Sequence, residues 1–91
     1  MAAEIIIPAI LRPMTSGADT VQSHGSTIIA IINDLEARFP GIKNRLCDDS
    51  GNTHRFVNIY LNGEDIRSLN QLDTPVHDSD EITIVPAIAG G

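Results

Sequence analysis

Residues 26–41 read STIIAIINDLEARFPG, and this stretch predicts the one long helix of the chain. Ser26 or Thr27 can cap the free N–H groups of a first turn. Phe39 precedes Pro40, which disfavours helical geometry at Phe39, so the helix should end near Arg38. Apolar residues recur at helical spacing and form one stripe, which indicates a helix packed by one face. They are Ile28, Ile31, Ile32, Leu35 and Phe39.

A strand pair is predicted before this helix. Glu4–Leu11 is rich in isoleucine and reads as a strand, with Pro8 at a bulge or an unpaired position because proline has no N–H. Thr15–Gly17 has the composition of a turn. Asp19–Ser23 then alternates in polarity, so the two segments should form a hairpin.

A second strand pair is predicted after the helix. Gly41–Thr53 is a polar connection in which Ile42 and Leu46 should anchor to the core. Arg55–Leu61 alternates, with Val57, Ile59 and Leu61 on one face and Phe56, Asn58 and Tyr60 on the other. Asn62-Gly63 is the usual pair for a type I′ turn, in which both residues have positive φ.

The remaining segments complete the sheet. Glu64–Arg67 should be a short return strand, and Leu69–Val76 should pack as irregular chain or a short helical turn through Leu69, Leu72 and Val76. Asp78–Asp80 reads as a turn. Glu81–Val85 is the last strand, with Ile82 and Ile84 facing inward.

The element order predicts an α+β fold of the β-grasp, or ubiquitin-like, class. One main helix on one face of a mixed four- to five-stranded sheet is the economical packing, with the first and last strands parallel in the middle. We expect residues 1–86 to form this domain and residues 87–91 to form a flexible C-terminal tail.

Composition excludes several classes of protein. A chain of 91 residues makes one domain. Its single cysteine excludes an internal disulfide, an iron–sulfur cluster and a cysteine-rich zinc site. No apolar run approaches the ~20 residues of a membrane-spanning helix, and the N-terminus lacks the basic residues of a secretory signal. We therefore expect a soluble cytoplasmic protein that is a monomer when free.

The formal net charge of -6 is unevenly placed along the chain. Residues 1–45 hold four acidic and four basic residues, whereas residues 46–91 hold eight acidic and two basic residues. Such a chain would repel nucleic acid. The acidic excess serves solubility or complements a basic partner, and its position in the C-terminal half predicts a basic partner surface around the tail.

The chain ends in VPAIAGG, and this tail is the candidate site. Five residues follow Pro86 and extend at most ~17 Å, so the last carboxylate can stand away from the domain. Side chains thin toward Gly90 and Gly91, which suits a narrow tunnel in a partner. A C-terminal carboxylate is a poor electrophile. ATP can convert it to an acyl adenylate, from which a sulfur nucleophile displaces AMP and leaves a thiocarboxylate.

No phosphate-binding loop of the P-loop or dinucleotide type is present, so a partner would have to bind the ATP. The chain would then be a substrate and carrier rather than an enzyme, with no bound cofactor.

Four segments share a pattern with a known family: Ile10–Pro13, Asp34–Ala37, His54–Tyr60 and Val85–Gly91. Together they resemble the ThiS/MoaD family of ubiquitin-like sulfur carriers, in particular its CysO/QbsE-type subgroup. The resemblance covers essentially the whole chain; the Gly-Gly terminus is general to the family, and the stretch from His54 to Asn58 is more specific. One departure is Ser79, where the family often has glycine between two acidic residues.

The resemblance implies a set of partners. An E1-like adenylating enzyme of the MoeB/ThiF type would activate Gly91, with Gly90 as its flexible neighbour and Ala87, Ile88 and Ala89 as docking contacts. For the CysO type it also implies a PLP-dependent cysteine synthase that accepts the sulfur. A metal-dependent protease of the JAMM type would then release cysteine from the carrier.

Other residues were weighed as site candidates. Phe56 and Tyr60 should line the open sheet face beside the tail, where ubiquitin-like domains commonly dock, although single exposed aromatics are also ordinary. Cys47 reads as a packing residue, because neighbouring acidic residues raise a thiol pKa. The three histidines are too dispersed for a metal site. They are His24, His54 and His77.

Three functions share this fold. The first is a sulfur carrier for cysteine or for a sulfur-containing metabolite or cofactor. The second is a protein modifier conjugated through Gly91 to lysines. The third is an interaction module whose tail is incidental.

Overall fold

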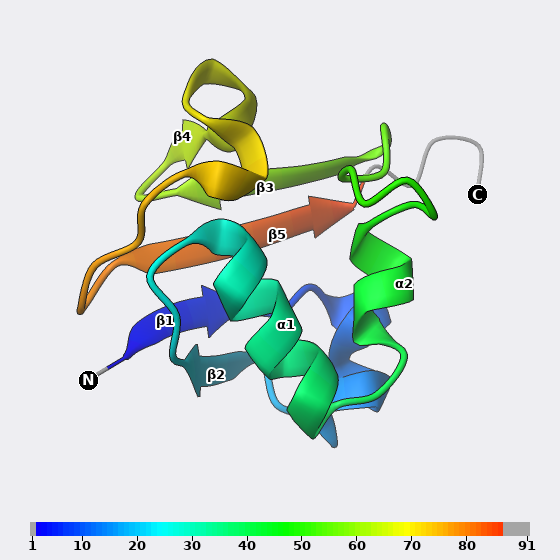
Figure 1. Ribbon diagram of the computed structural model, residues 1–91. Coiled ribbons are helices and arrows are strands. Elements are labelled where there is room, and N and C mark those ends of the chain that lie inside the picture. Colours follow the sequence, from blue (N-terminus) through cyan, green and yellow to red (C-terminus); the bar gives the residue numbers. More distant parts are fainter. Residues whose placement is uncertain (1, 87–91) are drawn as a thin grey trace.

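The sheet has five strands in the order β2-β1-β5-β3-β4, as the computed structural model of residues 2–86 shows (Figure 1). The strands are β1 (Ala3–Ile6), β2 (Thr20–Ser23), β3 (Val57–Leu61), β4 (Glu64–Asp65) and β5 (Glu81–Pro86). The α-helices are α1 (Ile28–Arg38) and α2 (Ile42–Leu46), and the 3₁₀ helices are η1 (Ala9–Thr15), η2 (Ile66–Ser68) and η3 (Gln71–Asp73).

The two strands nearest the chain ends meet in the middle of the sheet. β1 pairs with β5 in parallel, with Ile5 opposite Ile82. β5 also pairs antiparallel with β3, with Ile84 opposite Ile59. The hairpins β1–β2 and β3–β4 complete the two sides. The predicted β-grasp topology is therefore confirmed.

Helix α1 forms where the sequence predicts. Thr27 is its N-cap, and its Oγ1 accepts a hydrogen bond from the Ala30 N–H at 3.2 Å. The helix ends at Arg38, and Phe39 is only partly buried. Both α-helices lie on one face of the sheet (Figure 1), so the apolar stripe of α1 meets the inward side chains of the strands. The buried residues of the stripe are Ile28, Ile31, Ile32 and Leu35.

The first strand is shorter than predicted. It ends at Ile6, and the rest of the expected strand, up to Leu11, turns into η1. Pro8 causes the change, because it has no N–H to donate to a sheet ladder and its φ of -68° suits the start of a helical turn. The Leu11 N–H donates to the Pro8 carbonyl at 2.9 Å, and Leu11 is buried.

The polar connection after α1 contains a helix that the sequence analysis missed. Ile42 and Leu46 are fully buried, as predicted, but they are the two ends of the short helix α2. The Glu36 carboxylate accepts hydrogen bonds from the N–H groups of Gly41 and Lys43 at 3.0 and 2.9 Å, and these bonds hold its pKa below the usual range. Glu36 thus joins the end of α1 to the start of α2.

The second hairpin turns as predicted, but its return strand is shorter than predicted. Asn62 and Gly63 have φ values of 51° and 87°. The strand β4 then stops at Asp65 instead of Arg67, because the Asp65 side chain accepts from the Arg67 N–H at 2.9 Å and starts η2. Ile66 is thereby turned into the core.

The segment predicted as irregular chain or a short helical turn contains η3, a 3₁₀ helix. Val76 is buried and Leu72 packs partly against the core, whereas Leu69 is exposed. Two of the three predicted anchors therefore contact the core.

Ser79 occupies the turn before β5 with a φ of 69°, a left-handed conformation that disfavours residues with a Cβ. We predict that Ser79→Gly raises the free energy of unfolding by about 0.5 kcal/mol, because relief of this strain exceeds the extra unfolded-state entropy of glycine. Chemical denaturation measures the change. Ser26→Gly, at a position without positive φ, is the control and should lower stability. A loss of stability in Ser79→Gly would contradict the prediction.

Candidate functional site

The predicted tail site continues from the end of β5. Ala87, Ile88, Ala89, Gly90 and Gly91 lie outside the described residues. Pro86 is the last described residue and the last residue of β5, so the surroundings of Pro86 define where the tail begins.

Proline is tolerated at position 86 because Val57, the residue opposite it in the ladder, does not need an N–H donor from β5. Val57 lies opposite Pro86 in the ladder. The Val57 N–H donates to the His54 carbonyl at 3.0 Å, and the Val57 carbonyl accepts from Arg67 Nη2 at 2.8 Å. Both polar groups of Val57 are therefore satisfied without β5, and the missing N–H of Pro86 leaves no gap in the ladder.

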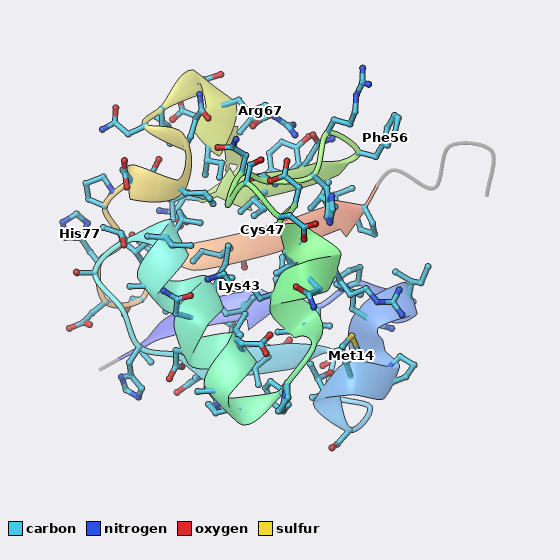
Figure 2. All side chains as sticks on the ribbon, turned by 45° about the vertical axis from the view of Figure 1, so that its right-hand side comes forward. Met14, Lys43, Cys47, Phe56, Arg67 and His77 are labelled. Atoms are coloured by element: carbon cyan, nitrogen blue, oxygen red, sulfur yellow. The ribbon has the colours of Figure 1, made fainter. Side chains whose placement is uncertain are left out.

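Exposed apolar side chains lie beside this strand end. Phe56, directly before β3, is 57% exposed, and Val85 is 40% exposed. Val85 lies opposite Asn58, two residues from Phe56 on the neighbouring strand. Figure 2 shows Phe56 projecting at the end of the sheet where β5 finishes. We refer to these two exposed apolar side chains together as the Phe56–Val85 patch.

The alternation predicted for Arg55–Leu61 is confirmed over β3, which begins at Val57 instead of Arg55. Val57 and Ile59 are buried on the helix side, so Tyr60 belongs to the opposite face. Phe56 lies in the turn that the Val57 N–H closes by donating to the His54 carbonyl, and it is exposed as predicted. Tyr60 lies opposite Thr83, further from Pro86, and is only half-buried. Of the two predicted docking residues, Phe56 is therefore the one at the tail end.

Positive charge accompanies the patch. The Arg55 guanidinium lies 5.4 Å from the centroid of the Phe56 ring, a cation–π distance. Arg12 Nε donates to the Ile7 carbonyl at 3.1 Å, and Ile7 follows β1, which runs parallel to β5 and so reaches the same end of the sheet. Arg67 contacts Val57 and His54.

Acidic residues gather at the other end of β5. Glu4 lies opposite Glu81, the first residue of β5, and Asp78 and Asp80 precede it. The six residues of β5 span ~20 Å, which separates this group from Pro86. This acidic group therefore does not surround Pro86, and the basic partner surface expected around the tail stays a prediction. Other acidic residues lie outside this group: Asp48 and Asp49 are in the loop before β3, and Asp19 lies beside Ile7, whose N–H donates to the Asp19 carbonyl at 2.8 Å.

Cys47 is buried, as predicted. Burial is the main cause that raises the pKa of its thiol; Asp48 adds to the rise and Lys43 opposes it. The group is therefore a protonated packing side chain at neutral pH. Within residues 2–86, no three His, Cys, Asp or Glu side chains are grouped to hold a metal ion, and no helix is long and apolar enough to cross a membrane.

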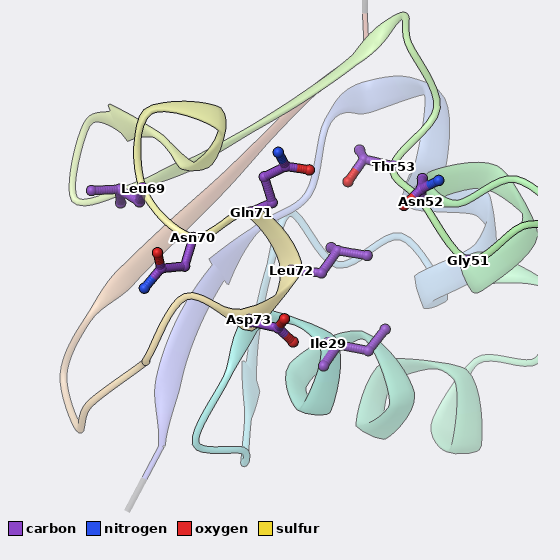
Figure 3. A pocket seen from close by; sticks show the side chains of 9 residues that line it. All are labelled: Ile29, Gly51, Asn52, Thr53, Leu69, Asn70, Gln71, Leu72 and Asp73. Carbon is purple, nitrogen blue, oxygen red and sulfur yellow. The ribbon is translucent and has the colours of Figure 1, made fainter.

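A groove of about 640 Å³ is lined by neither Phe56 nor Val85 (Figure 3). It opens between the first turn of α1, the loop at 51–53 and the segment 69–73. Its walls are largely neutral and polar, with Thr53 and Gln71 facing Leu72 and Ile29. The groove could not be predicted from the sequence, because its walls come from three segments that only the fold brings together.

The sequence model of the ThiS family matches residues 5–91. The chain is 50% identical to the sulfur carrier protein CysO of Mycobacterium tuberculosis over all of both chains, and the crystal structure of M. tuberculosis CysO has a TM-score of 0.90 at 49% identity, covering 94% of this chain and 99% of that one.

A crystal structure of the Amycolatopsis orientalis BexX/CysO complex contains a chain with a TM-score of 0.93 at 46% identity, covering 99% of this chain and 100% of that one. Small archaeal modifier protein 3 of Haloferax volcanii is 32% identical over 66 residues, which are 72% of this chain and 71% of that one.

We predict that the Phe56 side chain is not needed for folding. Phe56→Ala should change the free energy of unfolding by no more than about 0.5 kcal/mol, because the ring is exposed. Val57→Ala, at the adjacent buried position, should lower it by about 2 kcal/mol. Urea denaturation of both variants measures this difference. Equal losses would show that Phe56 packs on its own domain and is not available to a partner.

Proposed function

The chain belongs to the ThiS family, and we propose that it is a sulfur carrier protein whose C-terminal Gly91 carboxylate is converted to a thiocarboxylate. The observation that carries the proposal is the 50% identity to a sulfur carrier protein over the whole length of both chains. The relatives at 50% identity are named as sulfur carriers, and we propose that this chain likewise is not itself an enzyme but is acted on by partner enzymes.

The chemistry follows from the terminal group. An α-carboxylate has a pKa of ~3.5, so Gly91 is ionised at neutral pH and must be activated before it can react with a nucleophile. One carboxylate oxygen attacks the α-phosphate of ATP, and pyrophosphate leaves. A sulfur nucleophile then displaces AMP from the carbonyl carbon. The product is Gly91 with a thiocarboxylate, whose sulfur is the transferable cargo.

The ATP-binding apparatus belongs to an E1-like adenylating enzyme of the MoeB/ThiF type in this proposal. The carrier sequence has no P-loop or dinucleotide-type loop. We propose that Ala87, Ile88, Ala89 and Gly90 thread toward the partner's active site, and that the Phe56–Val85 patch docks beside it. Support comes from a relative that has been crystallised as a BexX/CysO complex.

The partner surface should complement the apolar and positively charged side chains at this end of the sheet. Phe56 and Val85 call for an apolar pocket, and Arg55, stacked on Phe56, calls for a carboxylate at the rim of that pocket. Tyr60 extends the same face and would lie at the edge of the contact. Such charge pairs affect the rate of association more than its final strength.

The similarity to CysO suggests which enzyme accepts the sulfur. A PLP-dependent cysteine synthase would use the thiocarboxylate as its sulfur source. A metal-dependent JAMM-type protease would then hydrolyse the bond between Gly91 and the new cysteine. Other acceptors, such as a sulfur-containing metabolite or cofactor, need the same carrier chemistry.

A protein modifier is the second candidate function. It is favoured by the 32% identity to a small archaeal modifier protein. In that role, a lysine Nζ would displace AMP from Gly91 and form an isopeptide bond. The two functions share adenylation and differ in the nucleophile, so their products differ in mass.

The proposal is tested with the purified chain, an E1-like enzyme, Mg-ATP and sulfide. We predict a thiocarboxylate at Gly91, because sulfide attacks the adenylate, and intact-mass spectrometry after alkylation detects it. Alkylation is needed because replacing oxygen by sulfur changes the mass almost as much as oxidation of Met1 or Met14. Pyrophosphate exchange reports adenylation separately.

Two controls complete this test. Omitting ATP, or deleting Gly91, should abolish the alkylated product. Adenylation without an alkylatable species at Gly91 would reject the carrier function, and higher-mass conjugates with other proteins would support the modifier.

A further inference from the structure

Arg67 makes an unusual set of contacts for a half-exposed side chain. Its Nη2 donates to the Val57 carbonyl at 2.8 Å and to the His54 carbonyl at 3.3 Å. Its Nη1 donates to the Asn58 Oδ1 and lies 4.0 Å from the Asp65 carboxylate. One guanidinium thus donates to three residues around the start of β3, namely His54, Val57 and Asn58.

These contacts satisfy backbone groups at the start of β3 that have no neighbouring residue in β4. The strand β4 is two residues long and pairs only with Tyr60 and Leu61. The start of β3 therefore extends past the end of β4, and Arg67 supplies donors to the Val57 carbonyl there. The turn at Asp65 that shortens β4 is also what brings Arg67 over β3.

The bound segment carries the docking residues. His54 and Val57, whose carbonyls Arg67 holds, flank Arg55 and Phe56 in the sequence. Val57 is also the ladder partner of Pro86, after which the tail begins. Arg67 is therefore linked, through the backbone of residues 54–57, both to the Phe56–Val85 patch and to the tail exit.

We propose that Arg67 is a positioning residue for activation of the tail: its guanidinium fixes residues 54–58 so that Phe56 and Pro86 meet the adenylating partner in one arrangement. The inference rests on the proposed function and deepens it. Arg67 need not touch the partner for this role.

The contacts require arginine rather than lysine. The guanidinium is planar and carries five N–H donors in a fixed fork, so it can bind two backbone carbonyls and an amide oxygen at once. A lysine ammonium at the same place is a single point donor on a flexible stem. Arg67→Lys should therefore behave more like the apolar variant Arg67→Met than like the unmodified chain.

Arg38 offers a matched control. Its Nη1 donates to the Gln22 carbonyl of β2 at 2.6 Å and pairs with Asp34 at 3.1 Å. Its side chain is 40% exposed, against 41% for Arg67. Both arginines thus bind a strand carbonyl and an aspartate, but Gln22 belongs to the outer strand β2, with β1 between it and β5.

The test compares Arg67→Met, Arg67→Lys and Arg38→Met as substrates of the adenylating enzyme, with pyrophosphate exchange as the assay. We expect similar losses of thermal stability in Arg67→Met and Arg38→Met. We expect KM for the carrier to rise roughly 5- to 30-fold in Arg67→Met only, with kcat nearly unchanged. This factor corresponds to the entropy lost when binding must order the backbone of one residue that Arg67 no longer holds. Amide hydrogen exchange at Phe56 and Val57 should accelerate in the same variant.

Two results would overturn the proposal. One is an equal KM for Arg67→Met and Arg38→Met, which would make Arg67 a structural residue only and leave the proposed function intact. The other is unchanged amide exchange at Phe56 and Val57 in Arg67→Met. Failure of the proposed function is distinguishable, because the unmodified chain itself would then show no pyrophosphate exchange.

Discussion

The parallel pairing of β1 with β5 is the constraint on which the rest of the structure depends. It joins the first strand of the chain to the last, with Ile5 opposite Ile82, in the middle of the sheet. Parallel strands cannot be joined by a tight turn, so the chain must pass over one face of the sheet, and α1 provides that crossing and covers the core. The same pairing directs β5 toward the end of the sheet at which Phe56 and Arg55 lie.

The reactive group and the fold are separated in this molecule. The core consists of aliphatic side chains, and its one thiol, Cys47, is buried with a raised pKa. The proposed chemistry lies at Gly91, beyond the last strand, where it costs the domain no strain. The domain contributes a surface: the Phe56–Val85 patch, with Arg55 beside it. Such a division suits the proposed function, in which several enzymes bind the carrier in turn.

Much of this fold could be predicted from local sequence signals, and the parts that could not depend on distant contacts. Helix α1 and the Asn62-Gly63 turn are specified by their own residues, and the alternation over Arg55–Leu61 predicts correctly that Phe56 is exposed. The helical turn after Pro8 was missed because its isoleucine-rich run resembles a strand. The role proposed for Arg67 could not be predicted, because the carbonyl and amide oxygens that its guanidinium binds lie nine to thirteen residues away and meet it only after β4 ends early. The tail was proposed from its terminal Gly-Gly and a family resemblance, and no fold signal could replace these.

The central claim, that Gly91 carries transferable sulfur, is tested most directly on the protein isolated from the cells that make it. Top-down mass spectrometry of the rapidly alkylated protein would locate any modification by fragmenting it from the C-terminus. If the protein is a sulfur carrier, a fraction of the molecules should carry an alkylated thiocarboxylate on Gly91, and this fraction should grow when the sulfur acceptor is withheld. An unmodified carboxylate in every molecule, or Gly91 found only in isopeptide bonds to other proteins, would contradict this claim.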